Sequence, residues 1–143
     1  MKINNITLFN FGSYEGYNTF DTYVDEKQSI VLIGGKNGAG KTTLFKALRL
    51  CLYGYLSLGH KAPNKDYYGE VKKLFNNSAR ITRPATMYVH LNIQLENPQG
   101  MDDYFLKRTW TLDQRVRENF EVLKNGELLS DQEVADFEKY LSS

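Results

Sequence analysis

The chain has 143 residues and a net charge of +1, which is long enough for one compact domain with a real core. The near-neutral balance gives no global electrostatic case for nucleic-acid binding, and no apolar run is long enough for a transmembrane helix. The single cysteine, Cys51, excludes an intrachain disulfide and is expected to be a small core residue in a reducing compartment. Because a first strand at about Lys2 leaves no signal-peptide architecture, we expect a cytoplasmic protein without membrane contact.

The first quarter of the chain predicts a hairpin followed by a buried strand. Residues 2–11 alternate roughly and contain β-forming side chains, residues 12–16 form a turn, and residues 17–23 predict the returning strand. After a polar loop at residues 25–28, residues 29–33 are a short, continuous apolar run with β-branched side chains. Such a run is typical of a central strand that is buried on both faces.

Residues 35–42 read G-K-N-G-A-G-K-T and fit the phosphate-binding pattern G-x-x-x-x-G-K-[ST] at every fixed position. Downstream, Leu44, Leu48 and Leu52 recur every four residues, which predicts one face of a helix. This helix is expected to end near Gly54, a residue type that favours helix C-termini. The order of strand, glycine loop and helix is the context that the pattern requires.

The glycine loop predicts a nucleotide-binding site. Its glycines let backbone N–H groups approach a ligand without Cβ clashes, and these groups favour anionic phosphate together with the positive end of the following helix. Lys41 is the candidate catalytic residue, because its ammonium would contact the β- and γ-phosphates, and the Thr42 hydroxyl is the candidate Mg²⁺ ligand. The candidate nucleotide-binding residues of the loop are Gly35, Lys36, Asn37, Gly38, Ala39, Gly40, Lys41, Thr42 and Thr43.

The middle of the chain predicts a helix and then a long strand. Residues 56–65 are loop-like, and apolar side chains at helical spacing predict a short amphipathic helix over residues 65–76. A basic loop at residues 77–84 follows. Residues 86–95 alternate cleanly between apolar and polar side chains, which predicts a half-buried strand.

The last third predicts a hairpin and a terminal helix. Strands are expected over residues 104–112 and 120–124, and residues 125–126 read N-G, a strong hairpin-turn signal. Ser130 and Glu133 form a capping box that opens a helix. The side chains expected to face inward from that helix are Val134, Phe137 and Leu141.

Several features of a complete nucleotide hydrolase are missing. No run of four apolar residues precedes Asp or Glu, so residues 25–26 and Glu96 are only weak candidates for the acidic partner of Mg²⁺. Residues 56–60 lack the paired glycines of the ABC-type signature, and residues 64–66 place the carboxylate one position too early for the guanine selector N-K-x-D. No second metal ligand lies at suitable spacing from either histidine, His60 or His90.

The charge is distributed unevenly along the chain. Residues 1–60 carry a net charge of +2, residues 61–90 carry +4 and residues 91–143 carry −5. The ordinary interpretation of the middle segment is a solvated surface, and a DNA-facing patch is the alternative. That patch would contain Lys61, Lys65, Lys72, Lys73, Arg80 and Arg83.

The pattern as a whole resembles the N-terminal half of SMC-like ATPase heads, a family that includes the RecF-type and double-strand-break-repair coiled-coil ATPases. The resemblance rests on the strand that starts near residue 2 and on residues 33–43, since N-G-x-G-K-[ST] is the habitual form of the loop in that family. Residues 47–54 and 107–110 are similar to the DndD family of DNA sulfur-modification ATPases. Many relatives carry a basic residue in the segment that corresponds to residues 10–14, where this chain has N-F-G-S-Y.

The resemblance implies an α/β fold of the P-loop NTPase class: the N-terminal lobe of an ABC/SMC-type ATPase head, with a mixed sheet and an antiparallel β-subdomain. Residues 1–143 would form this single lobe of a longer coiled-coil ATPase. By resemblance the cofactors are ATP and Mg²⁺, Asn37 contacts the γ-phosphate region, and Ser13 or Tyr14 replaces the missing basic residue on the adenine side.

The resemblance also implies what the lobe works with. A C-terminal lobe and a homodimer partner would complete the site, and ATP hydrolysis would be coupled to DNA modification, restriction or repair with other DNA-modification proteins. This chain alone is expected to bind ATP weakly and to hydrolyse it barely.

Two other functions remain open. A non-catalytic nucleotide-binding or assembly module is compatible with the missing acidic partner. A P-loop small-molecule kinase would need an arginine-rich lid, for which Arg80 and Arg83 are the only candidates, and the strand-rich second half argues against it.

Overall fold

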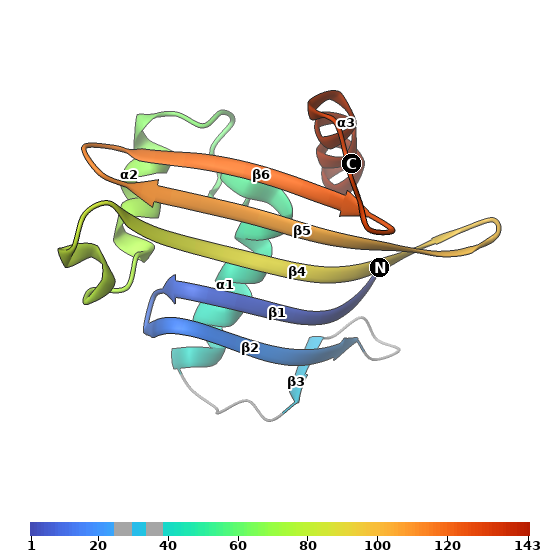
Figure 1. Ribbon diagram of the computed structural model, residues 1–143, viewed down its shortest axis with the longest axis horizontal. Coiled ribbons are helices and arrows are strands. Elements are labelled where there is room, and N and C mark those ends of the chain that lie inside the picture. The colour runs from blue at the N-terminus through green and yellow to red at the C-terminus, as the bar shows by residue number, and fades with distance from the viewer. Residues whose placement is uncertain (25–29, 34–38) are drawn as a thin grey trace.

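Seven strands of the described chain form one antiparallel sheet in the order β3-β2-β1-β4-β5-β6-β7 (Figure 1). The computed structural model describes residues 1–24, 30–33 and 39–143. The strands are β1 (Lys2–Phe11), β2 (Tyr14–Val24), β3 (Ile30–Ile33), β4 (Ala85–Asn97), β5 (Gly100–Leu112), β6 (Val116–Lys124) and β7 (Glu127–Leu128). The helices are α1 (Ala39–Tyr53), α2 (Lys65–Leu74) and α3 (Asp131–Ser142), with the 3₁₀ helices η1 (Gly54–Leu58) and η2 (Ala79–Ile81).

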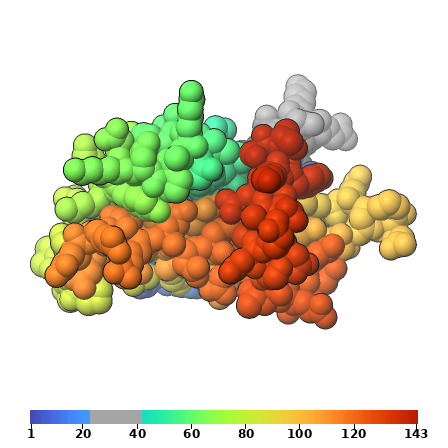
Figure 2. All heavy atoms as spheres, turned by 90° about the horizontal axis from the view of Figure 1, so that it is seen from above, coloured from blue at the N-terminus to red at the C-terminus, as the bar shows by residue number. Residues whose placement is uncertain are grey.

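The helices cover one face of the sheet. Figure 1 shows α1, α2 and α3 behind the strands, and the space-filling view in Figure 2 shows the green helical segment layered over the orange strands. Strand β4 explains this arrangement, because its side chains alternate between buried and half-buried from Ala85 to Leu95. One face of an antiparallel strand can therefore join the core while the other meets solvent.

Helix α1 supplies the other side of this core. Its predicted apolar face is confirmed, since Leu44, Leu48 and Leu52 are all buried. Cys51 lies on the same side, and its thiol donates to the carbonyl oxygen of Val89 at 3.4 Å. The expectation that Cys51 is a small core residue is therefore confirmed.

Two expectations about the sheet are wrong. The sheet was expected to be mixed, with the strand at residues 29–33 in its centre, but every described strand pair is antiparallel and β3 stands at the edge, paired with β2 alone. The reason is connectivity: β2 leads into β3 with only residues 25–29 between them, and a parallel pairing needs a much longer crossover.

Several element boundaries also differ from expectation. Strand β2 begins at Tyr14 rather than at residue 17. A loop was expected from residue 56, but residues 56–58 belong to the 3₁₀ helix η1. Strands β5 and β6 each begin four residues before the predicted starts. Cross-strand pairing extends these strands beyond the segments whose side chains alternate clearly.

The local turn and cap signals are confirmed. Asn125 and Gly126 both have positive φ angles, 51° and 85°, as a tight two-residue hairpin requires. Ser130 and Glu133 form the complete capping box at the start of α3. In the part of the chain described here, no helix has the length and apolar character needed to cross a membrane.

Candidate nucleotide-binding site

The predicted phosphate loop joins β3 to α1. Strand β3 ends at Ile33 and α1 begins at Ala39, so the strand and the helix expected on either side of the glycine-rich segment are confirmed. Ala39, Gly40 and Lys41 form the start of α1, and the following Thr42 has an exposed side chain. The predicted binding residues that lie outside the described residues are Gly35, Lys36, Asn37 and Gly38.

The described end of α1 fits a phosphate group. The helix has 15 residues and no acidic residue in its first turn, so its positive N-terminal end faces no local carboxylate from that turn. The adjacent Thr42 hydroxyl is exposed and offers an oxygen ligand of the kind that Mg²⁺ prefers. These residues can therefore hold an anionic phosphate and its metal ion.

The turn between β1 and β2 lies directly against this end of α1. Gly12 has a φ angle of +58°, and a Cβ atom built on it would lie 2.8 Å from Cγ2 of Thr43. That distance is too short for a normal contact, so only glycine fits here without a shift of its neighbours. Ser13 is exposed on the same turn, so the structure brings this predicted adenine-side residue close to the helix of the phosphate loop.

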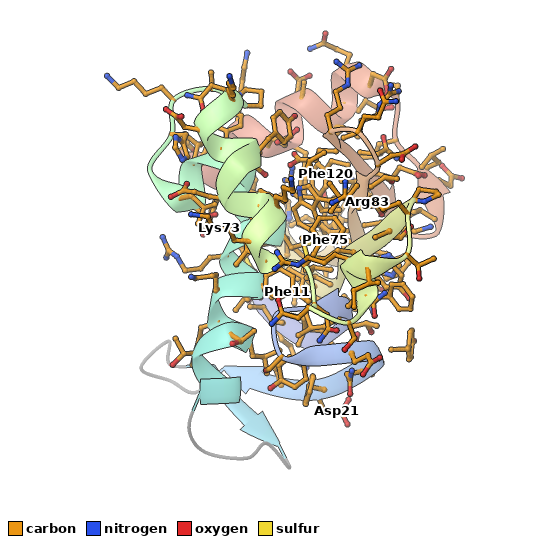
Figure 3. All side chains as sticks on the ribbon, turned by 90° about the vertical axis from the view of Figure 1, so that its left-hand side faces the viewer. Phe11, Asp21, Lys73, Phe75, Arg83 and Phe120 are labelled. Carbon is orange, nitrogen blue, oxygen red and sulfur yellow. The ribbon has the colours of Figure 1, made fainter. Side chains whose placement is uncertain are left out.

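The C-terminal end of α2 holds this turn in place. The Gly12 N–H donates to the Leu74 carbonyl at 2.6 Å, and Nδ2 of Asn76 donates to the Gly12 carbonyl at 3.0 Å. The backbone of Phe11 forms a bridge with Phe75, and Figure 3 shows the two rings near one another in the core. The sequence did not indicate the role of Asn76, because a buried asparagine after a helix has no distinctive pattern.

The opposite end of α1 is anchored by a buried arginine. Arg108 on β5 is 2% exposed, and its Nε donates to the Cys51 carbonyl at 3.0 Å. Its Nη1 donates to Oε2 of Glu118 at 3.0 Å, and its guanidinium lies 3.8 Å from the ring centroid of Phe120. The guanidinium also packs under Gly54, where an added Cβ would lie 3.0 Å from Nη1. A cation therefore sits where the helix exposes its last carbonyl groups.

Glu118 is the centre of the hydrogen bonds around this arginine. Its Oε1 accepts from Nε1 of Trp110 at 2.6 Å and from the Tyr67 hydroxyl. Burial, and next the negative charge of Glu118, raise the pKa of Tyr67 well above its usual range. On the other side, Nη2 of Arg108 lies 3.6 Å from Oε2 of Glu138 on α3 but makes no hydrogen bond within the described chain. We call Arg108, Glu118, Trp110 and Tyr67 together the Arg108 centre. Through its contacts with Cys51 and Glu138, it joins α1, α2, α3 and the sheet.

Comparison with known families matched residues 5–142 to the family described as AAA domain. The chain belongs to this AAA domain family. No curated protein matched the chain. Membership supports an SMC/ABC-type ATPase region and therefore the use of ATP and Mg²⁺ in general.

Other candidate residues of this AAA domain have structural roles. The side chain of Asn64 accepts from the Tyr67 N–H at 2.9 Å and caps α2, so the N-K-D stretch begins a helix. His60 pairs with Glu70. Glu96 is exposed near the end of β4, and the described residues contain no group of three or more possible metal ligands from His, Cys, Asp and Glu.

His90 belongs to a row of rings on the face of the sheet opposite the helices. Its ring stacks on Tyr88 at 4.0 Å and meets Phe105 edge-on at 5.4 Å. Burial, and next the charge of Lys107, lower the pKa of His90 from its ordinary value of 6.5 to about 4. This histidine is therefore neutral at neutral pH.

Proposed function

We propose that this AAA domain binds ATP with Mg²⁺ at the N-terminal end of α1 and acts as the N-terminal lobe of an SMC-like ATPase head. The observation that carries the proposal is the contact between Gly12 and Thr43, which sets the β1–β2 turn beside the start of the phosphate-loop helix. A nucleotide bound there could meet the loop with its phosphates and the turn with its base.

In this proposal, each group of residues has a separate role in binding the nucleotide. Backbone N–H groups at the start of α1 and the Lys41 ammonium would neutralise the phosphate charge. The Thr42 hydroxyl would ligate Mg²⁺, which supplies charge stabilisation when bound. Ser13 would contact the adenine side in place of a basic residue. The Arg108 centre would hold the far end of α1 and so keep the helix fixed against the sheet.

The proposal extends to an ATPase of the DndD type, in which ATP binding and hydrolysis are coupled to work on DNA. ATP binding would close two heads into a homodimer, a C-terminal lobe would supply the acidic metal partner, and hydrolysis would reopen the heads during DNA modification, restriction or repair. The absence of an apolar run followed by Asp or Glu supports the idea that another lobe completes the site. It equally favours the second candidate, a non-catalytic nucleotide-binding module.

Binding of a fluorescent ATP analogue, with and without Mg²⁺, tests the site. We expect Lys41→Ala to abolish binding and Thr42→Ala to remove its dependence on Mg²⁺. Lys46→Ala is the matched control, because Lys46 is an exposed lysine of the same helix. Equal binding by the Lys41 variant, the Lys46 variant and the unchanged protein would refute the assignment.

Turnover separates the two candidates. Steady ATP hydrolysis by the chain alone that Lys41→Ala abolishes would contradict the need for a second lobe. The ATPase proposal requires DNA-stimulated turnover in the complete head. A complete head that binds ATP without turning it over in the presence of DNA would establish the module instead.

A further inference from the structure

A pocket of about 550 Å³ lies between the first turns of α2 and the hairpin that joins β5 to β6. It is lined by Lys65, Tyr68, Arg115, Val116, Arg117 and Glu118, and we name it the basic pocket. Its cations come from two sequence segments about fifty positions apart. Lys65 lies in the basic middle third of the chain, and Arg115 and Arg117 lie in the acidic last third.

The cations of the basic pocket are available to a ligand. Lys65, Arg115 and Arg117 are exposed, and within the described residues none of them forms an ion pair with a carboxylate. The one carboxylate that lines the pocket, Glu118, is already engaged by Arg108 and by two hydrogen-bond donors. The pocket therefore presents uncompensated positive charge.

The surface around the pocket has the same sign. Helix α2, the loop that contains η2 and the β5–β6 hairpin gather at one end of the molecule in Figure 1, and Figure 3 looks onto that end, with Lys73 and Arg83 labelled. The further basic side chains on these segments are Lys72, Lys73, Arg80 and Arg83, and Lys61 lies four residues before α2. The acidic ones are Asp66, Glu70 and Asp113.

The basic pocket is separate from the proposed nucleotide site. The C-terminal end of α2 contacts the β1–β2 turn through Leu74, whereas Lys65 is its first residue. Ten helical residues span about 15 Å at 1.5 Å per residue. A ligand in the basic pocket would thus lie about one helix length from the turn that abuts α1.

The arrangement of these cations is better suited to bind the phosphodiester backbone of a nucleic acid than its exposed bases. Several cations spread over one surface can each pair with one of the regularly spaced phosphates. Single-stranded nucleic acid is held largely by aromatic stacking, but Tyr67 is fully buried here and Tyr68 is half-buried, with its ring centroid 5.0 Å from that of Tyr67. We infer that the basic pocket binds the phosphate backbone of duplex DNA. This inference takes its choice of polyanion from the proposed DNA-linked function, but it does not depend on ATP binding.

Fluorescence anisotropy of a labelled DNA duplex, measured against salt concentration, tests the inference. The test variant replaces Lys65, Arg115 and Arg117 by Gln. We expect the slope of log K against log salt to shrink by about 3, at about 0.9 for each lost phosphate contact, and the low-salt affinity to fall at least about tenfold. Because all three side chains are exposed, circular dichroism should show an unchanged fold.

The matched control replaces Lys2, Arg49 and Lys139 by Gln, which removes the same charge from exposed sites outside the pocket and its basic surroundings. An equal loss of affinity in both variants would overturn the inference, as would failure of the unchanged protein to bind duplex at low salt. Stronger binding of a single strand than of the duplex would also overturn it. Loss of duplex binding with unchanged binding of the fluorescent ATP analogue supports the basic pocket, whereas absent ATP binding refutes only the proposed nucleotide site.

Discussion

The Arg108 centre allows a sharp prediction about stability, through the substitution Glu118→Gln. The change keeps the shape of the side chain but replaces one of its two acceptor oxygens by an NH₂ group, which only donates. In the structure Oε2 accepts from Arg108 and Oε1 accepts from Trp110 and Tyr67. Whichever way the amide turns, its NH₂ group faces either the guanidinium or the indole N–H, and neither can accept.

The expected cost follows from this conflict. Removal of one partner from a buried ion pair costs about 3–5 kcal/mol. Arg108 keeps its hydrogen bond to Cys51 and lies 3.6 Å from the partly exposed Glu138, so we expect the lower end of that range. For a domain of this size, about 3 kcal/mol corresponds to a fall in melting temperature of roughly 6–12 °C.

Urea unfolding followed by tryptophan fluorescence is the appropriate assay, because Trp110 is the only tryptophan and is fully buried beside Glu118. The matched control is Glu121→Gln on the same strand, where the side chain is half-buried, and we expect a loss below about 1 kcal/mol. Adding Arg108→Met to Glu118→Gln should restore part of the stability, because the unpaired charge is then gone. Equal midpoints for the two glutamine variants, or additive losses in the double variant, would refute the reasoning.

Three further predictions concern a turn, a titrating side chain and a thiol. Gly12→Ala should lower the free energy of unfolding in urea titrations by at least about 2 kcal/mol, because it adds a clash with Thr43 to the backbone strain. The control Gly16→Ala, at a φ angle of +68° with open space around it, should cost about 1 kcal/mol. Equal losses in the two variants would disprove the clash. His90 has its pKa lowered from 6.5 to about 4, so the unfolded chain binds a proton first and stability should fall as pH drops through this window. His90→Gln should flatten that loss in urea midpoints measured across the window, and an unchanged profile would assign it to other groups. Burial raises the pKa of the Cys51 thiol to about 12, so a thiol reagent in mildly alkaline buffer should label it only as fast as the protein opens, and rapid labelling of the native state would contradict this.

The parts of the fold that depend on neighbouring residues could be predicted from the sequence. The strict alternation of β4, the N-G hairpin turn and the Ser130 capping box each follow from local geometry, because a strand has a period of two and a tight turn needs positive φ angles. The position of α1 was equally accessible, since its apolar spacing and the preceding glycines mark where the helix begins.

The order of the strands could not be predicted in this way. Residues 29–33 have the composition of a central parallel strand, yet β3 lies at the edge and runs antiparallel to β2. A run of apolar residues indicates that a strand is buried but not which part of the protein covers it. Which strands pair with one another depends on segments distant in sequence.

The candidate sites likewise include features that could be predicted from local sequence and features that depend on tertiary contacts. The sequence by itself determined the phosphate-loop pattern with Lys41 and Thr42, because the spacing within one loop and helix carries that chemistry. Only the tertiary structure set Gly12 against Thr43, placed Arg108 against the Cys51 carbonyl, and brought the cations of the basic pocket together. Each of these contacts joins segments far apart along the chain, and their distances are decided by how the helices pack on the sheet rather than by any local preference.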